Sequence, residues 1–381
     1  MKICAIICEY NPFHNGHLYQ MQEARRLSGA DAVLCVMSGN FVQRGEAAIV
    51  DKFTRAKHAV LAGADAVIEL PTVFATSNAE LFAKGAIAIL ASIPHVSTLC
   101  FGAETADKEA FIKAASLLNN EPKEISDKIK ELSASGLSYA KARALAWEGL
   151  LPESLLSSPN NILGLEYTRA ILEVKANMDI LPLQRVGAGY GDKNLHANFS
   201  SATAIRSAIC TGEDYADNLP DFVAKDLPRQ IENHLETLEK YAILSTPLQQ
   251  LGKVCDCSEG LENALKKAAL ERETLAVALT SARYTSSRIR RIALQNLLKI
   301  EEKLIRDCLR SSLYLRVLGV KKARKDVLSA LSEGSFPLIA RPRDEQALTD
   351  IAKECYAVDI FSEKVYGLLY TCKKEIDIFI E

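Results

Sequence analysis

The segment with the clearest capacity for chemistry is residues 9–18, in which His14 and His17 flank Gly16. It directly follows an apolar run typical of a buried strand and precedes a helical pattern. Imidazoles at a helix start can hydrogen-bond phosphate oxygens, the helix dipole favours negative charge there, and a glycine lets a ligand approach the backbone. Preorganised donors of this kind stabilise the charge that develops as pyrophosphate leaves an α-phosphate. This position predicts a nucleotide site with catalytic histidines, although two solvent-exposed turn histidines are the alternative.

A second polar segment, Ser200 to Arg206, opens a predicted short helix. The His-x-Gly-His turn resembles the HIGH-type nucleotidyltransferase superfamily, and this segment is similar to the Ser-Ser-Thr-x-Ile-Arg signature of its small-molecule adenylyltransferases. The resemblance implies that Ser201, Thr203 and Arg206 bind the β- and γ-phosphates. Ala202 departs from the signature and removes one hydroxyl contact. Taken alone, the segment would be an ordinary helix cap followed by a surface arginine.

Four further loops, at residues 37–46, 101–104, 159–164 and 185–190, resemble those of the bacterial tRNA(Met) cytidine acetate ligase family. The resemblance implies an enzyme that forms acetyl-adenylate from ATP and acetate and acetylates N4 of the wobble cytidine of elongator tRNA(Met), giving N4-acetylcytidine. Ala47, where many relatives are expected to have proline, is a departure that affects only loop rigidity. The implied ATP contacts are Ile7, Cys8, Glu9, Tyr10, Asn11, Pro12, Phe13, His14, Asn15, Gly16, His17, Leu18, Tyr19, Gln20, Gly102, Asn161 and Arg185.

Polar residues also follow the second predicted strand, at the same sheet edge as the histidines. They are predicted to bind the small carboxylate or to orient the adenylate. In the alternative interpretation, Arg44 only pairs with Glu46 and Asn161 only caps a helix. Mg²⁺ is expected to arrive with the nucleotide, because no carboxylate cluster in the sequence predicts a metal held by the protein. The predicted substrate-binding residues are Ser38, Asn40, Gln43 and Arg44.

The elements that must position these residues alternate along the first hundred residues. Apolar runs at 3–8, 32–37, 66–70 and 96–101 predict buried strands, with helices near 17–28, 51–63 and 77–92 between them. A further strand is expected at 181–186 and a short helix at 200–211, whereas no convincing strand pattern follows residue 220. The fold class is therefore α/β: a Rossmann-like doubly wound parallel sheet, followed by a mostly α-helical C-terminal part.

Length and charge suggest how the chain is divided. At 381 residues, two or three domains are expected. We expect an ATP-binding adenylating domain at 1–220 and a helical tRNA-binding domain at 221–381. The net charge of −2 hides fifteen Lys and Arg against five Asp and Glu within residues 281–343, which favours a polyanionic partner over a merely solvated helix face. The cations at 299, 303, 306 and 310 are expected to repel one another on one helix stripe. The predicted tRNA contacts are Arg288, Arg290, Arg291, Lys321 and Lys322.

Composition excludes several classes of protein. A hydrophobic content of 48% with 25% charged residues excludes a disordered chain. The sequence shows no secretion signal and no span suited to a membrane. Ten dispersed cysteines are typical of buried thiols in a reducing compartment, so we expect a cytoplasmic protein. No feature indicates an obligate protein partner.

Two other function classes remain open from the sequence. One is a small-molecule nucleotide adenylyltransferase, although those enzymes are usually much shorter. The other is a non-catalytic RNA-binding protein with a vestigial nucleotide pocket, which ATP–pyrophosphate exchange would distinguish from an enzyme. An aminoacyl-tRNA synthetase is disfavoured, because no Lys-Met-Ser-Lys-Ser-like loop follows the predicted α/β unit.

Overall fold

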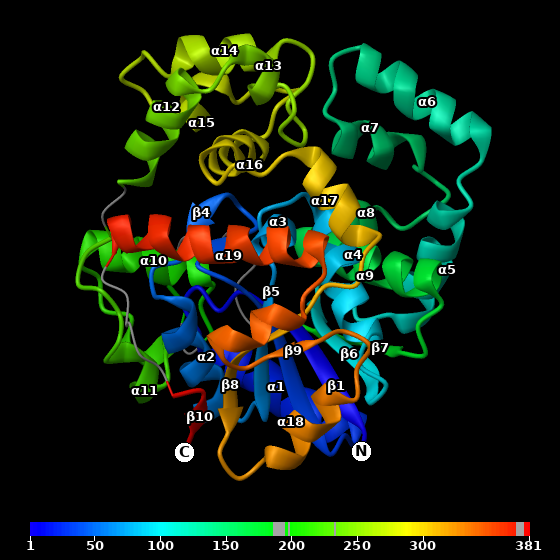
Figure 1. Ribbon diagram of the computed structural model, residues 1–381. Coiled ribbons are helices and arrows are strands. Elements are labelled where there is room, and N and C mark those ends of the chain that lie inside the picture. Colours follow the sequence, from blue (N-terminus) through cyan, green and yellow to red (C-terminus); the bar gives the residue numbers. More distant parts are fainter. Residues whose placement is uncertain (186–194, 197–198, 232–233, 371–376) are drawn as a thin grey trace.

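The computed structural model describes residues 1–185, 195–196, 199–231, 234–370 and 377–381 (Figure 1). Its centre is a sheet with strand order β10-β8-β5-β2-β1-β6-β7, in which the five strands from β5 to β7 run parallel. These parallel strands are apolar and mostly buried, as expected for strands covered on both faces. Their bounds are β1 Ile3–Cys8, β2 Ala32–Ser38, β5 Ala66–Leu70, β6 Val96–Ala103 and β7 Asp179–Gln184.

Helices cover both faces of the sheet, which confirms the doubly wound α/β fold. Alternate residues of β1 and β2 pack into two different cores, because successive strand side chains point to opposite faces. One core lies under α1 (Asn15–Ser28), α2 (Lys52–Leu61) and α10 (Ala202–Thr211). The other lies under α3 (Thr72–Ala75), α4 (Ala79–Ala91), α5 (Lys108–Asn119), α9 (Pro159–Val174) and α19 (Asp350–Leu369).

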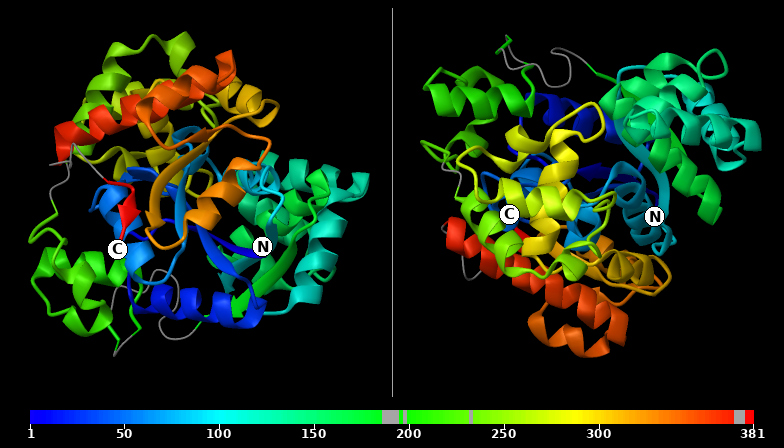
Figure 2. Two further views of the ribbon diagram at one scale, coloured as in Figure 1. Left: turned by 60° about the horizontal axis from the view of Figure 1, so that its bottom comes forward. Right: turned by 90° about the horizontal axis from the view of Figure 1, so that it is seen from above.

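Two groups of helices stand above the carboxyl ends of the parallel strands (Figures 1 and 2). The first contains α6 (Lys123–Ala134), α7 (Tyr139–Ala146) and α8 (Glu153–Ser157). The second has a core of its own and contains α12 (Leu235–Ser245), α13 (Leu248–Leu251), α14 (Leu261–Ala268), α15 (Leu275–Leu279) and α16 (Ser286–Leu297). The groups touch where the amide of Ser138 donates to the carbonyl of Ala282.

Short elements join these parts. The hairpin of β3 (Phe41–Val42) and β4 (Glu46–Ala47) follows β2. Further along the chain come η1 (Ala216–Asn218), α11 (Asp221–Ala224), α17 (Glu302–Leu309), α18 (Lys325–Ser332) and η2 (Pro342–Ala347).

The C-terminal part is mostly helical, but the expectation that no strand follows residue 220 is wrong. β8 (Leu315–Lys321) pairs antiparallel with β5, and β9 (Leu338–Ile339) and β10 (Phe379–Ile380) pair with β8. The pattern was hidden because Arg316 interrupts the apolar run. Its guanidinium is buried against the carboxylates of Glu69, at 3.2 Å, and Glu363, at 2.7 Å. A domain boundary near residue 220 stays a prediction.

Within the described part of the chain, no helix is both long enough and apolar enough to cross a membrane.

Candidate functional site

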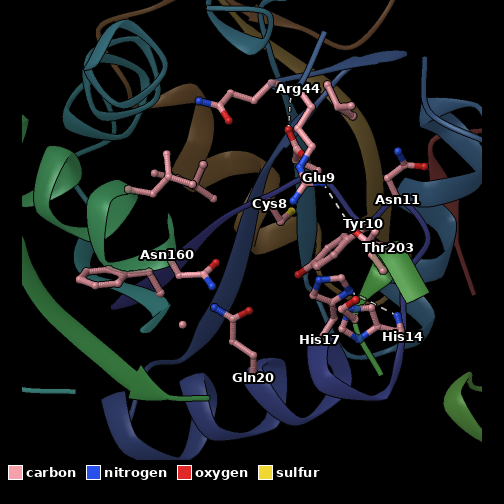
Figure 3. Close-up of a pocket in the computed structure, with 18 of the residues that line it drawn as sticks. Cys8, Glu9, Tyr10, Asn11, His14, His17, Gln20, Arg44, Asn160 and Thr203 are labelled. Carbon is pink, nitrogen blue, oxygen red and sulfur yellow. Dashed lines mark hydrogen bonds between the residues drawn. The ribbon is translucent and has the colours of Figure 1, made fainter. Parts of the chain in front are cut away.

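The main cavity lies at the carboxyl ends of β1 and β6, between α1, α9, α10 and the β3–β4 hairpin (Figure 3). This is where ligands bind in open parallel sheets. Fifteen of the residues predicted from the sequence line it: Ile7, Cys8, Glu9, Tyr10, Asn11, His14, His17, Gln20, Gln43, Arg44, Gly102, Arg185, Ser201, Thr203 and Arg206.

His14 and His17 form a stacked pair at the start of α1, with ring centroids 3.7 Å apart. The Nδ1 of His14 accepts from the amide of Gly16 at 3.1 Å, and the Nδ1 of His17 accepts from the amide of His14 at 3.3 Å. A ring nitrogen that accepts a hydrogen bond carries no proton, so each neutral ring carries its proton on Nε2. Both imidazoles are therefore held as Nε2–H donors.

Burial keeps both rings uncharged. It lowers the pKa of His14 to about 3, with further contributions from the Arg185 and Arg206 guanidiniums. Burial, followed by the effects of His14 and Arg185, holds the pKa of His17 well below its usual range. Near pH 7 the pair therefore offers neutral hydrogen-bond donors, and the positive charge of the site comes from the arginines.

The start of α10 forms the second wall. The Ser201 hydroxyl caps the helix by accepting from the amide of Ala204 at 3.0 Å. Arg206 reaches back to the first motif, because its Nη1 donates to the carbonyl of Asn11 at 2.7 Å. The hydroxyl of Thr203 accepts from Nη1 of Arg44 at 3.4 Å. The two predicted motifs, far apart in sequence, thus face one cavity.

Arg55 fixes the loops beneath the cavity. Its buried guanidinium donates to the carbonyls of Glu9, Ser38, Gly39 and Val50, which lie after β1 and β2. These four bonds hold the two strand ends together and satisfy carbonyls that could not otherwise be buried.

Three of the predicted contact residues lie behind the cavity wall. Ser38 and Asn40 are buried, and the side chain of Asn40 accepts from the amide of Lys52 at 2.8 Å. The side chain of Asn161 accepts from the amides of Glu104 and Thr105 at 2.9 and 3.2 Å. The side chains of Asn40 and Asn161 therefore support loops, whereas the Ser38 hydroxyl makes no hydrogen bond to a described residue. The neighbouring Asn160 lines the cavity.

Six other predicted residues also lie outside the main cavity lining. Gly16 and Tyr19 line an adjoining recess, whereas Phe13 is buried in the core. The side chain of Asn15 donates to the carbonyl of Asp217 at 2.8 Å. The remaining two are Pro12 and Leu18. Of the loop at 185–190, residues 186–190 lie outside the described part of the chain.

Several lining residues were missed by the sequence reasoning. Glu46 and Asn160 stand inside loops singled out by resemblance, so a reading of every polar residue in those loops would have included them. Phe82 and Tyr167 lie within helices, where apolar spacing predicts burial but does not distinguish a cavity wall from a core. The missed residues are Val42, Glu46, Phe82, Phe101, Asn160, Leu163, Tyr167 and Ala202.

Among the basic residues of α16, Arg290 contacts the lining of this cavity. Arg290 forms an ion pair with Glu46, whose carboxylate also lies 3.8 Å from Arg206. Arg291 is mostly buried and lies 4.0 Å from Asp256. Arg288 donates to the carbonyl of the same residue at 2.6 Å. The arginines of α16 thus hold the helix against Glu46 and Asp256. Glu46 pairs with Arg290 and Arg206 rather than with Arg44.

The predicted stripe of mutually repelling cations is not present. Lys299 precedes α17 and has a left-handed backbone, with φ of 61°. Lys303 pairs with Asp307 at 2.6 Å, and Arg306 pairs with Glu302. The helix therefore neutralises these charges through its own i,i+4 pairs.

Lys321 and Lys322 lie at the opposite end of the sheet. The amide of Lys321 donates to the carbonyl of Asp65, which precedes β5, and Lys322 pairs with Glu381 at 2.5 Å. Because β8 runs antiparallel to β5, these lysines lie at the amino ends of the parallel strands, away from the cavity.

Comparisons with known proteins agree with the site. A family described as HIGH Nucleotidyl Transferase matches residues 1–377. The chain is 39% identical to the tRNA(Met) cytidine acetate ligase of Caldanaerobacter subterraneus subsp. tengcongensis, covering 97% of this chain and 96% of that protein. It is 37% identical to the protein of the same name from Thermoanaerobacter sp. (strain X514), with the same coverage.

Solved structures show the same similarity. The apo crystal structure of Thermotoga maritima TmcAL superposes with a TM-score of 0.89 at 30% identity, covering 98% of this chain and 96% of that one. The crystal structure of Thermotoga maritima TmcAL bound with alpha-thio ATP gives a TM-score of 0.87 at 31% identity, covering 98% and 95%.

Proposed function

The chain belongs to the tRNA(Met) cytidine acetate ligases of the HIGH nucleotidyltransferase family, and we propose that it uses ATP to activate acetate and acetylates N4 of the wobble cytidine of elongator tRNA(Met). One observation carries the proposal: two neutral imidazoles, fixed as Nε2–H donors, share one cavity with the guanidiniums of Arg44, Arg185 and Arg206. Such an arrangement suits adenylyl transfer, because its donors are fixed before charge develops.

The first step is adenylation. An acetate oxygen attacks the α-phosphorus of ATP, a new P–O bond forms, and the bond to pyrophosphate breaks with its electron pair leaving on pyrophosphate. The Nε2–H groups of His14 and His17 donate to the non-bridging α-phosphate oxygens, on which charge grows in the transition state. Ser201, Thr203 and Arg206 hold the departing phosphates. Mg²⁺ carried by the nucleotide supplies further neutralisation of phosphate charge.

Acetate binds beside the hairpin in this proposal. Arg44 and Gln43 both line the cavity, and the Arg44 guanidinium already lies within hydrogen-bond distance of Thr203. A guanidinium can bind a carboxylate through two parallel hydrogen bonds. Asn40 contributes indirectly, through its side chain, and Ser38 through its carbonyl, which accepts from Arg55.

The second step is acetyl transfer. The exocyclic nitrogen of cytidine attacks the acetyl carbonyl, a C–N bond forms, and the bond to the adenylate oxygen breaks. AMP leaves with the electron pair, and the nitrogen loses one proton to solvent. No covalent intermediate on the enzyme is required. Arg288, Arg290 and Arg291 on α16 are the proposed RNA contacts near the cavity, whereas Lys321 and Lys322 contribute only at long range. Since ATP and tRNA are cytoplasmic, so is the proposed enzyme.

Product analysis tests this proposal. Purified protein is incubated with labelled acetate, ATP and unmodified tRNA(Met), and both the nucleotides and the RNA nucleosides are analysed. We expect AMP, pyrophosphate and labelled N4-acetylcytidine, and no acetylation from acetyl-CoA without ATP. Formation of ADP, or efficient acetylation from acetyl-CoA alone, would contradict the proposal.

A further inference from the structure

Away from the histidines, the cavity continues into an aromatic recess between α4 and α9. This recess is lined by Phe82, Phe101, Leu163, Tyr167 and Asn160. The Tyr167 ring lies 5.9 Å from that of Phe101 and 6.5 Å from that of Phe82, measured between centroids. Flat, closely spaced rings of this kind form surfaces on which a nucleobase can stack.

A glycine on α9 makes the recess possible. A Cβ at Gly164 would lie 2.4 Å from a ring carbon of Phe101, so any other residue would push that ring or the helix away. The helix and the strand β6 therefore approach more closely here than side chains normally allow. The wall formed by Phe101 depends on this contact.

The recess also contains a hydrogen-bond donor without a partner. Tyr167 lines the cavity and is only 4% exposed, and its hydroxyl makes no hydrogen bond to another described residue. Burial raises the pKa of Tyr167, and the nearby Glu9 and Cys8 raise it further, so the hydroxyl keeps its proton. The hydroxyl can therefore donate a hydrogen bond to a ligand in the cavity.

An acceptor lies on the same side of the cavity. The Nδ2 of Asn160 donates to Oε1 of Glu104 at 2.6 Å, and Oε2 of the same carboxylate accepts from the amide of Asn161 at 3.0 Å. This contact uses the amide nitrogen of Asn160 and orients its Oδ1 as an acceptor. Asn160 lies across the cavity from the two histidines, and the Glu9 carboxylate lies at the end of β1 between them (Figure 3).

We propose that this aromatic recess receives the cytosine base of the RNA substrate, with Tyr167 and Asn160 reading its edge. Cytosine presents an amine donor beside a ring-nitrogen acceptor, whereas uracil presents the reverse pattern. The acceptor of Asn160 and the donor of Tyr167 match cytosine and oppose uracil. The inference rests on the proposed function and adds to it the residues that select the base.

In this proposal, the adenine of ATP binds in a second recess. It adjoins the main cavity at His14 and His17, on the side of α1, and it contains Tyr19 and Phe199, whose ring centroids lie 6.3 Å apart. The aromatic recess instead lies on the face covered by α4. Helix α16 also packs on that face, where Gln295 donates to the carbonyl of Thr76 at 2.9 Å. The proposed RNA-binding helix and the aromatic recess thus lie on the same face of the sheet.

The test separates adenylation from acetyl transfer. Tyr167→Phe removes one hydroxyl and keeps the ring, and Asn160→Ala removes the acceptor. For each variant, kcat/KM for tRNA acetylation should fall roughly 3- to 10-fold, the loss expected for one hydrogen bond. Acetate-dependent ATP–pyrophosphate exchange and its KM for ATP should not change. Tyr356→Phe, the same chemical change on α19, is the matched control and should alter neither reaction.

A measure of base selectivity excludes a merely structural effect. A tRNA(Met) with uridine at the wobble position cannot be acetylated and serves as a competitive inhibitor. Tyr167→Phe should reduce the preference of the enzyme for the cytidine-containing tRNA over this inhibitor.

Three outcomes would overturn the proposal. A raised KM for ATP in the exchange reaction of either variant would mean that the recess holds adenine. Wild-type acetylation and wild-type selectivity in both variants would mean that the recess is only a packing feature. Absence of acetate-dependent exchange in the wild-type protein would reject the proposed function, and this inference with it.

Discussion

The basic segment at 281–343 contributes cations to both ends of the sheet, and the two groups differ in their surroundings. Arg290 on α16 lies at the carboxyl end and contacts Glu46 in the cavity. Lys321 and Lys322 lie at the amino end, which is the end of the sheet opposite the cavity. Strand β8 separates the groups, because its seven residues cross about 20 Å. Charge density along a sequence therefore does not define one binding surface.

The largest expected difference between the two ends concerns the histidines. His14→Ala should slow acetate-dependent ATP–pyrophosphate exchange by two to three orders of magnitude, because losing one transition-state donor costs about 2.7–4 kcal/mol. His95→Ala is the matched control at the amino end, where this ring pairs with Glu333, and it should leave the exchange rate unchanged. Near wild-type exchange in a folded His14→Ala, His17→Ala double variant would contradict the assignment of the cavity as the catalytic end.

Low pH should also reduce the stability of the folded protein, through His14 at the cavity end of the sheet. Burial lowers the pKa of His14 to about 3 in the folded protein, below 6.5 for the free side chain. Between pH 6.5 and pH 3 the unfolded state binds the proton and the folded state does not, so stability falls as the pH falls. From pH 7 to pH 5 this group alone should cost about 2 kcal/mol. Urea unfolding should show a correspondingly smaller loss in His14→Ala, and an equal loss would assign the acid sensitivity to other groups.

Substitutions of two arginines of α16 test whether residues at the rim of the cavity affect ATP binding within it. Arg290 forms an ion pair with Glu46, which lines the cavity, so a change at Arg290 also affects the nucleotide site. Arg290→Gln should weaken tRNA binding and also change the KM for ATP severalfold, since freeing a partly buried carboxylate costs about 1 kcal/mol. Arg288→Gln, whose guanidinium contacts Asp256, should weaken only tRNA binding. Equal effects of both variants on the KM for ATP would show that the contact with Glu46 is unimportant.

The smallest effect is expected at the amino end. Changing Lys321 and Lys322 together to Gln should alter the Kd for tRNA less than about twofold, because surface substitutions outside an interface usually act within about 0.5 kcal/mol. Filter binding at two salt concentrations measures this. A large loss with a flatter salt dependence would show that the RNA extends along the whole height of the sheet.

The sequence predicted the parts of the fold whose signals are local. β1 has the expected bounds, because it is an uninterrupted apolar run flanked by turns. β5 also has them, because Glu69 is a single charge near the end of an otherwise apolar run. β8 was missed because the burial of Arg316 depends on Glu69 and Glu363, which are remote in sequence. A charge inside a run is normally a sign of exposure.

In the site, too, the sequence predicted the residues whose signals are local and missed those that depend on distant contacts. His14 and His17 were found because their spacing, the preceding strand and the following helix lie within twenty residues. Phe82 and Tyr167 were not found, because a buried aromatic on a helix has the same spacing whether it faces a core or a cavity. Only the close approach of α9 to β6 at Gly164, a contact between distant segments, distinguishes these alternatives.

The pairing of β5 with β8 also constrains the order in which the protein can fold during synthesis. β5 ends at residue 70, but the strand that covers its free edge begins at residue 315. Throughout translation of the intervening residues, the nascent α/β unit presents an unpaired, apolar edge to the surrounding solvent, and such edges template aggregation. The sheet can therefore be completed only after most of the chain has been synthesised. A nascent chain whose translation stops after β5 and before β8 is the form most in need of a chaperone.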